Sequence, residues 1–282
     1  KLISTSYAAE SKKYRTPYQP SLFEQDAPQF DPAKTSVRGK IFVLDHDIDG
    51  DGRIDFHDLE WRYLDGDGDF RSAEVTALRD QADIIVTNPP FSLFREFLAW
   101  IVEAQKGCIL IGNTNAITYK EVFPLIKGNQ LWLGATGFST DMVFGVPEGT
   151  EVPEAYKRKA EKMGYVGNYT RLGNSCWFTN IDHGRRHQPL SLMTMEENIM
   201  YSKHKEIRGK GYAHYDNYDA IEVPYTDAIP SDYYGVMGVP ITFLDKYCPE
   251  QFEILGVFNH GSDGPWDFAT ATVNGIDKYK RL

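Results

Sequence analysis

The chain has 282 residues, a formal net charge of −10, 41% hydrophobic residues and 25% charged residues. This length suffices for one large domain or two modest domains, and the composition is typical of a globular protein. No window approaches the run of about 20 apolar residues that a transmembrane helix requires, which excludes a membrane-spanning protein. The three cysteines lie far apart. A disulfide framework is therefore excluded, and we expect a reducing, cytoplasmic compartment.

In chain order, short apolar runs alternate with helical patterns up to a Gly/Pro/Glu-rich seam at 145–153. Continuous buried strands that alternate with helices are typical of a mostly parallel sheet covered on both faces. The clearest helix is expected to begin at Ser92, its N-cap, and to stop at Gly107. The runs that we predict to be strands are 1–6, 40–44, 83–87, 108–111 and 130–133.

The pattern changes after the seam. Segments such as 212–219 and 233–243 are rich in aromatic and turn residues, which favours irregular β structure. We therefore predict an α/β domain at 1–150 and a β-rich region at 151–282, with strands that pack back on the first domain. Residues 1–6 have the pattern of a strand that has already begun before residue 1, so we expect an N-terminal segment to precede them.

The tetrapeptide Asn-Pro-Pro-Phe at 88–91 directly follows a predicted buried strand. An exocyclic amino group is a poor nucleophile because its lone pair is delocalised into the adjacent π-system. The Asn88 side-chain oxygen and the Pro89 carbonyl can accept both of its hydrogens and turn the lone pair toward a methyl donor. Pro90 helps to fix that carbonyl, and Phe91 offers a face on which a flipped base can stack. The alternative is a rigid turn that ends the strand.

Several segments together resemble the EcoRI-type adenine-specific DNA methyltransferase family, and the resemblance covers most of the chain. These segments are 66–72, 82–96, 111–121, 177–180, 215–220 and 235–246. The resemblance implies a bacterial enzyme of a restriction-modification system, or an orphan methylase, that uses S-adenosylmethionine on an adenine in duplex DNA. A cognate restriction endonuclease would act on the same site without direct contact. The residues that the resemblance places at the target amino group are Asn88, Pro89, Pro90 and Phe91.

The cofactor residues implied by the resemblance lie earlier in the chain. In methyltransferases with this kind of sheet, an Asp-Phe pair binds the adenine of S-adenosylmethionine, and we assign these roles to Asp69 and Phe70. The alternative is a Gly/Asp turn with a buried Phe. Ser6 and Glu10 are the nearest candidates for the end of the second strand, where an acid usually binds the ribose. The loop that holds the methionine part is expected upstream of residue 1.

The charges are unevenly distributed along the chain. The segment between residues 157 and 210 contains eleven Lys and Arg residues and five Asp and Glu residues, which gives it a local charge of +6. Because phosphate binding is driven by Lys and Arg, we predict that duplex DNA lies across this stretch. The alternative is a solvated surface. The candidate DNA contacts are Arg171, Arg185, Arg186, Lys203 and Lys205.

An acidic segment at 47–58 fits the template of a calcium-binding loop. The carboxylates at the ligand positions of this template are Asp47, Asp49, Asp51, Asp55 and Asp58. Two features oppose a calcium site: the last position is Asp rather than the longer Glu, and a strand rather than a helix precedes the loop. We therefore favour an acidic surface loop without a metal.

The sequence thus predicts a Rossmann-like α/β methyltransferase sheet with an appended, irregular β-rich target-recognition region. The expected activity is methyl transfer from S-adenosylmethionine to the amino group of a flipped adenine in duplex DNA. Two alternatives stay open: a methyltransferase that acts on RNA or on a protein glutamine amide, and a calcium-binding protein without catalysis.

Overall fold

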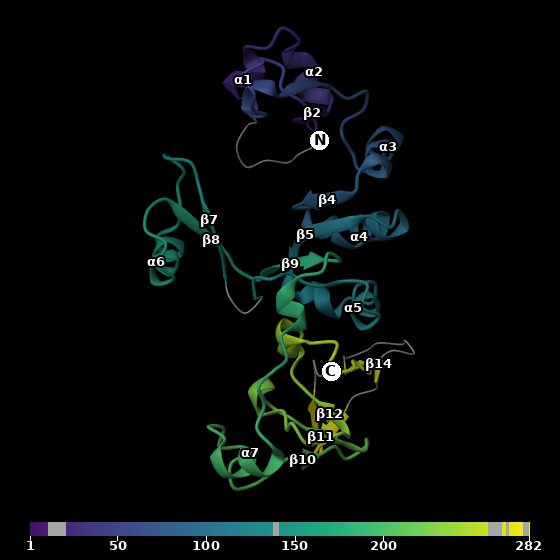
Figure 1. The fold of residues 1–282 in the computed structure, drawn as a ribbon, viewed down its shortest axis with the longest axis vertical. Helices are drawn as coiled ribbons and strands as arrows, with labels where there is room; N and C mark the ends of the chain where they lie inside the picture. The colour runs from purple at the N-terminus through teal and green to yellow at the C-terminus, as the bar shows by residue number, and fades with distance from the viewer. Residues whose placement is uncertain (11–20, 138–140, 259–266, 269–270, 279–281) are drawn as a thin grey trace. The chain divides into compact units, whose positions relative to one another are not determined.

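The computed structural model describes residues 1–10, 21–137, 141–258, 267–268, 271–278 and 282, and shows a mixed α/β protein (Figure 1). The chain forms two compact units. Unit 1 contains Lys1–Asp83 and Trp100–Lys106, and unit 2 contains Ile84–Ala99 and Gly107–Leu282. Among the described residues, no helix has the length and apolar character needed to cross a membrane.

Unit 1 is built on an antiparallel three-stranded sheet. The order is β1-β2-β3, with Leu2 opposite Leu44 and Lys40 opposite Tyr63. The elements of this unit are β1 (Leu2–Ser6), α1 (Leu22–Gln25), α2 (Pro32–Val37), β2 (Lys40–Leu44), β3 (Glu60–Tyr63) and α3 (Ala73–Gln81).

A buried ion pair anchors α1 to this sheet. The Lys40 ammonium lies 2.6 Å from a carboxylate oxygen of Glu24, and both side chains are at least nine-tenths buried. The rings of Phe30, Trp61 and Tyr63 lie within 6.0 Å of the same ammonium. Because either charge would be costly to bury alone, the pair and its aromatic surroundings specify where α1 docks.

Unit 2 has a four-stranded central sheet in the order β4-β5-β9-β6. Its strands are β4 (Ile84–Thr87), β5 (Gly107–Asn113), β6 (Trp132–Leu133) and β9 (Ser175–Thr179). In this sheet β4 and β5 pair in parallel, whereas β9 is antiparallel to both β5 and β6. The prediction of a mostly parallel sheet is therefore wrong for these strands. The five predicted strands themselves are all confirmed, as β1, β2, β4, β5 and β6.

The predicted helix between β4 and β5 is present, but both of its predicted ends are wrong. The chain first turns through a short 3-10 helix, Phe91–Leu93, in which the Leu93 N–H donates to the Pro90 carbonyl at 2.8 Å. The helix α4 then spans Phe94–Glu103. Pro90, with φ −54°, already directs the chain into the turn before Ser92, so Ser92 is not the N-cap. Gly107 begins β5 instead of ending the helix.

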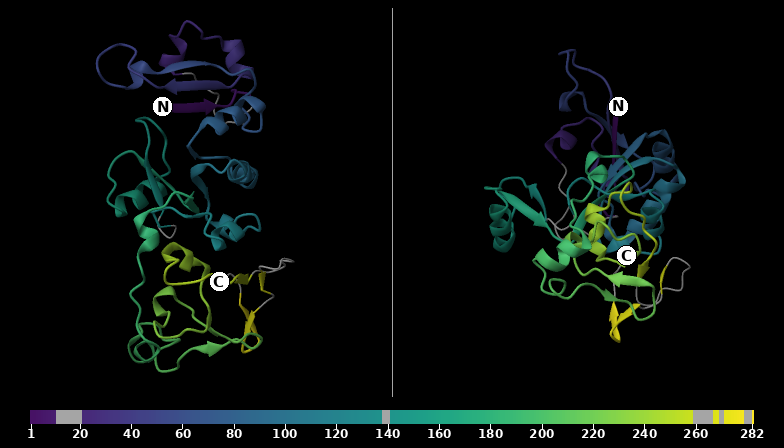
Figure 2. Two further views of the ribbon diagram at one scale, coloured as in Figure 1. Left: turned by 45° about the vertical axis from the view of Figure 1, so that its right-hand side comes forward. Right: turned by 60° about the horizontal axis from the view of Figure 1, so that its bottom comes forward.

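The rest of unit 2 consists of short elements. The strands β7 (Met142–Gly145) and β8 (Tyr169–Leu172) form an antiparallel ladder, and α6 (Glu154–Lys162) packs on β8 (Figure 2). The others are α5 (Phe123–Lys127), α7 (Met195–Tyr201), β10 (Ala213–His214), β11 (Ala220–Glu222), β12 (Val236–Gly238), β13 (Val257–Phe258), β14 (Asp267–Phe268), β15 (Ala271–Val273) and β16 (Ile276–Lys278).

A prediction follows from the packing around Gly112 in β5. A Cβ atom there would lie 2.6 Å from the Phe94 ring and 2.8 Å from the Phe178 ring, closer than packed side chains allow. We expect Gly112→Ala to lower the free energy of unfolding by about 1–3 kcal/mol, measured by urea denaturation. Gly184→Ala is the control, because a Cβ at Gly184 meets no atom within 4 Å. Equal stability of the two variants would contradict this account of the core.

Candidate active site

The Asn88–Phe91 turn lies at the carboxyl end of β4. Asn88, Pro90 and Phe91 are exposed, and Pro89 is buried. Neither the Asn88 side chain nor the Pro89 carbonyl has a hydrogen-bond partner within the described part of the chain. The turn therefore carries two acceptors without a partner, one on the exposed Asn88 and one on the buried Pro89, beside an aromatic ring that is 39% exposed.

The carboxyl end of β5 lies at the same edge of the sheet. Thr87, the last residue of β4, is opposite Leu110, and β5 continues to Asn113, whose side chain accepts the Asn115 N–H at 2.9 Å. No role was predicted for Asn113 or Asn115. Their position directly after a buried strand could have indicated one, because α/β sheets bind ligands at the carboxyl ends of their strands.

Arg95 of α4 connects the helix to the segment that follows β5. Its guanidinium lies 3.4 Å from the Glu121 carboxylate and 5.7 Å from the centroid of the Tyr119 ring. These contacts connect the first turn of α4 to residues 119 and 121.

Asp69 and Phe70, the predicted cofactor residues, lie in unit 1. The two carboxylate oxygens of Asp69 accept from the Arg71 guanidinium at 2.9 and 2.7 Å, and this contact lowers the pKa of Asp69. The Phe70 ring is 5% exposed and meets the Trp100 ring edge-on at 5.6 Å between centroids. Asp69 is therefore an ionised, partly exposed acceptor, whereas Phe70 packs inside the unit. Their cofactor roles stay predictions.

Ser6 lies against the turn that carries Asp69. A Cβ atom on Gly68 would come within 2.5 Å of the Ser6 carbonyl oxygen, and the Ala8 N–H donates to the Asp67 carbonyl at 2.8 Å. The structure thus brings Ser6 close to the Gly68–Asp69 dipeptide. The Glu10 carboxylate accepts from the Ser36 hydroxyl. Binding of the ribose by Ser6 or Glu10 stays a prediction.

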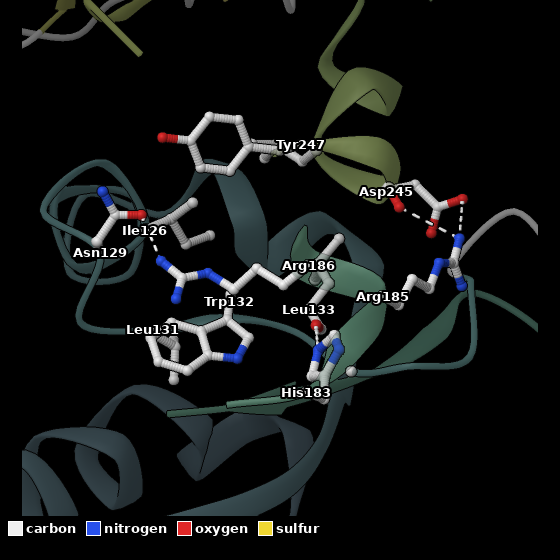
Figure 3. A pocket seen from close by; sticks show the side chains of 12 residues that line it. Ile126, Asn129, Leu131, Trp132, Leu133, His183, Arg185, Arg186, Asp245 and Tyr247 are labelled. Atoms are coloured by element: carbon white, nitrogen blue, oxygen red, sulfur yellow. Dashed lines mark hydrogen bonds and ion pairs between the residues drawn. The ribbon is translucent and has the colours of Figure 1, made fainter. Parts of the chain in front are cut away.

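Three of the side chains predicted to contact DNA form hydrogen bonds or ion pairs within the protein. Arg185 donates to the Ala135 carbonyl at 2.8 Å and pairs with Asp245 at 3.0 Å. The Arg186 guanidinium lies 3.9 Å from the centroid of the Trp132 ring and donates to Asn129 at 2.7 Å, as Figure 3 shows. Arg171 donates to Asp141 at 2.7 Å.

The pocket in Figure 3 lies among Arg185, Arg186, Trp132 and His183, and its volume is about 20 Å³. The Nδ1 atom of His183 and the Nε atom of Arg186 are buried there without a partner in the described structure. A cavity of this size accommodates one water molecule, which would satisfy such atoms, but no nucleobase. This pocket is therefore part of the protein's internal support and not a substrate site.

Lys203 and Lys205 keep their predicted surface position. The Lys203 side chain is 75% exposed and its ammonium pairs with Asp227 at 2.7 Å, and Lys205 is exposed. Contacts to DNA at these two residues and at the three arginines stay predictions.

The acidic loop uses its carboxylates within the loop itself. Asp58 is 2% exposed, and its oxygens accept the N–H groups of Ile48 and Asp55 at 2.6 and 2.9 Å. These hydrogen bonds lower the pKa of Asp58. Asp47, Asp49 and Asp58 each place one oxygen within 4.8 Å of the others. The loop is thus held by its own backbone donors, and the predicted loop without a metal and its calcium-binding alternative both stay untested.

His187 bridges two segments of unit 2 and gives a pH-dependent prediction. Its Nε2 lies 2.7 Å from Asp182 and its Nδ1 lies 2.6 Å from Glu250, so both ring nitrogens donate only when the ring is protonated. Asp182 and Glu250 raise the pKa of His187 above its usual value near 6.5.

The contribution of this bridge is complete below about pH 6.5 and is lost as the pH rises through the raised pKa. We therefore expect wild type to have a higher melting temperature than His187→Gln at about pH 6. The difference between the two melting temperatures should become smaller toward about pH 9. Thermal unfolding across this range checks the prediction. A gap that is constant with pH would show that the charge of His187 is not what stabilises the bridge.

Comparison with known proteins identifies the family of the chain. The model of the family described as "Adenine-specific methyltransferase EcoRI" matches residues 1–281, and the chain belongs to this family.

Three relatives support this assignment. The type II methyltransferase M.EcoRI of Escherichia coli is 40% identical over 93% of the chain, which covers 74% of that protein. M.MpnI of Mycoplasma pneumoniae and M.MgeORF184P of Mycoplasma genitalium are each 37% identical over 68% of the chain, which covers 57% of each of them. No solved structure matches the chain significantly.

Proposed function

We propose that the chain binds S-adenosylmethionine and transfers its methyl group to the exocyclic amino group of an adenine flipped out of duplex DNA. The family and the names of its relatives support a site-specific adenine DNA methyltransferase. The observation that carries the mechanism is the pair of acceptors without a partner in the described residues, the Asn88 side chain and the Pro89 carbonyl, at the end of β4.

The arrangement of β4, α4 and β5 supports a Rossmann-like origin for this part of the sheet. Two parallel strands joined by a crossover helix are the repeating unit of doubly wound α/β folds. In such folds the ligand binds beyond the carboxyl ends of the strands, which is where the Asn88–Phe91 turn lies. The antiparallel β9 then extends the sheet on the other side of β5.

The two acceptors of the turn match the two hydrogens of the target amino group. Its two N–H groups donate to the Asn88 side-chain oxygen and to the Pro89 carbonyl, so that the nitrogen lone pair leaves the plane of the base. Phe91 stacks on the flipped base, which is worth about 1–3 kcal/mol and offsets part of the energy of unstacking. The nitrogen forms a bond to the methyl carbon, the carbon–sulfur bond breaks, and the nitrogen then loses one proton.

Residues of unit 1 offer a hydrogen-bond acceptor that suits the adenine part of the cofactor. S-adenosylmethionine supplies an electrophilic methyl group on a positively charged sulfur. The ionised, partly exposed Asp69 carboxylate would accept from the adenine amino group of the cofactor, and Ser6 lies beside it. Phe70 is buried on Trp100 and would support Asp69 from below the surface.

The relatives' type II designation supports a restriction-modification role. A cognate endonuclease that cuts the same DNA site would then be the functional partner. The methyltransferase would protect that site by modification, without any contact between the two proteins.

The experiment that tests the function is methyl transfer from labelled S-adenosylmethionine to unmethylated duplex DNA, followed by nucleoside analysis. We expect labelled N6-methyladenine. Asn88→Ala removes one acceptor and is expected to lower kcat by about 10²–10³, in the range measured for single hydrogen bonds to a transition state. Asn88→Asp keeps an acceptor oxygen and is expected to retain more activity than the Ala variant.

Ser92→Ala is the matched control, because Ser92 is an exposed neighbour outside the acceptor pair. It is expected to keep wild-type turnover. An active Asn88→Ala variant would contradict the role of Asn88. Methylation of RNA or of a protein glutamine, without methylation of DNA, would reject the proposed function itself.

A further inference from the structure

The helix α6 presents an unusually basic surface. Of its nine residues, Glu154–Lys162, only Ala160 is buried, at 1% exposure. The cations of the helix are Lys157, Arg158, Lys159 and Lys162, and its acids are Glu154 and Glu161. The helix contacts β8, and Arg158, Lys159 and Lys162 are exposed whereas Lys157 is half-buried.

Most of the cations of α6 are not neutralised by neighbours. Arg158 pairs with Glu154 at 3.3 Å, one helical turn away. Within the described part of the chain, Lys157, Lys159 and Lys162 have no ion-pair partner. Lys159 and Lys162 are three residues apart and therefore share a face, about 4.5 Å apart along the helix axis. The helix thus carries an array of free ammonium groups.

Apolar side chains are exposed directly beside this array. Met163, Tyr165 and Val166 are 37%, 44% and 81% exposed. Met163 is the C-cap of the helix, and the other two lie between Gly164 and Gly167. Both glycines have a positive φ, of 90° and 122°, which other residues rarely adopt.

The array is held in place by contacts to β8. The Arg171 guanidinium lies 5.7 Å from the centroid of the Tyr156 ring and donates to Asp141 at 2.7 Å. The rings of Tyr165 and Tyr169 meet at 5.4 Å between centroids. The cations are therefore presented on a preorganised support, which lowers the entropy cost of binding.

We propose that the segment Glu154–Gly167, here called the α6 arm, grips the backbone of duplex DNA, with Lys157, Lys159 and Lys162 on phosphate groups. This inference rests on the proposed function. The anionic backbone is the partner that an array of free cations complements. Lysine ammonium groups suit this role because they contact phosphates as mobile point charges without reading the sequence.

The test uses the full chain and a fluorescein-labelled duplex of random sequence, about 30 base pairs long, over about 50–300 mM KCl. We expect the double substitution Lys159→Gln and Lys162→Gln to raise Kd on the order of tenfold at about 0.15 M salt. The slope of log Kd against log salt should fall by about two, one for each lost phosphate contact. In methyl transfer, KM for DNA should rise while kcat at saturating DNA is unchanged.

The matched control is Arg53→Gln, an exposed cation in the acidic loop of unit 1, which should leave Kd and the slope unchanged. An unchanged Kd and slope in the double variant would overturn the proposal. A lower melting temperature with unchanged DNA affinity would also overturn it, because the lysines would then only stabilise the end of the helix. Preferential, lysine-dependent binding of single-stranded RNA over duplex DNA would overturn it as well.

These outcomes separate the two proposals. If wild type methylates adenine in DNA and the double variant binds DNA as wild type does, the proposal for the α6 arm is wrong and the proposed function stands. If wild type does not methylate DNA at all, the proposed function fails, whatever the arm binds.

Discussion

The candidate active site depends on one packing contact in the core of unit 2. The rings of Phe94 and Phe178 meet at 5.1 Å between centroids, and the absence of a side chain on Gly112 makes room for both. These residues belong to α4, β9 and β5, so the contact fixes the helix against two strands. Because the Asn88–Phe91 turn joins β4 to α4, this contact anchors the helix that directly follows the turn. Within the turn itself, Asn88 is exposed and Pro89 is buried.

Local signals in the sequence predicted the strands well, because five apolar runs sufficed to locate β1, β2, β4, β5 and β6. Long-range pairing could not be predicted in the same way. The partner of β5 on its far side is β9, which comes after the β7–α6–β8 segment and runs antiparallel. Hydrophobic periodicity says that a strand is buried but not which strand it meets or in which direction. The Ser92 N-cap failed for a local reason, because the geometry of Pro90 turns the chain earlier than the side-chain pattern indicates.

The basic stretch shows what charge counting can and cannot establish. The excess of cations at 157–210 is visible in the sequence, but Arg171, Arg185 and Arg186 bond inside the protein to residues far away in the chain. A planar guanidinium stacks on rings and forms several directed hydrogen bonds, so buried and interfacial positions favour arginine. The free cations of α6 are mostly lysines. The distinction between internal and external cations therefore came from the structure, whereas the turn that we propose to be catalytic was located from the Asn-Pro-Pro-Phe motif alone.

An acidic chain can bind DNA because the charges that matter are those near the contact. At physiological salt the screening length is about 8 Å, so a phosphate on the α6 arm interacts chiefly with the charges of that arm. The net charge of −10 includes the acidic loop, which belongs to unit 1 and not to the α6 arm. In the proposed function, cations on phosphates supply affinity without sequence preference, and the acceptors of the Asn88–Phe91 turn act only on an amino group that has been brought to them. The two proposals therefore assign binding and chemistry to different residues.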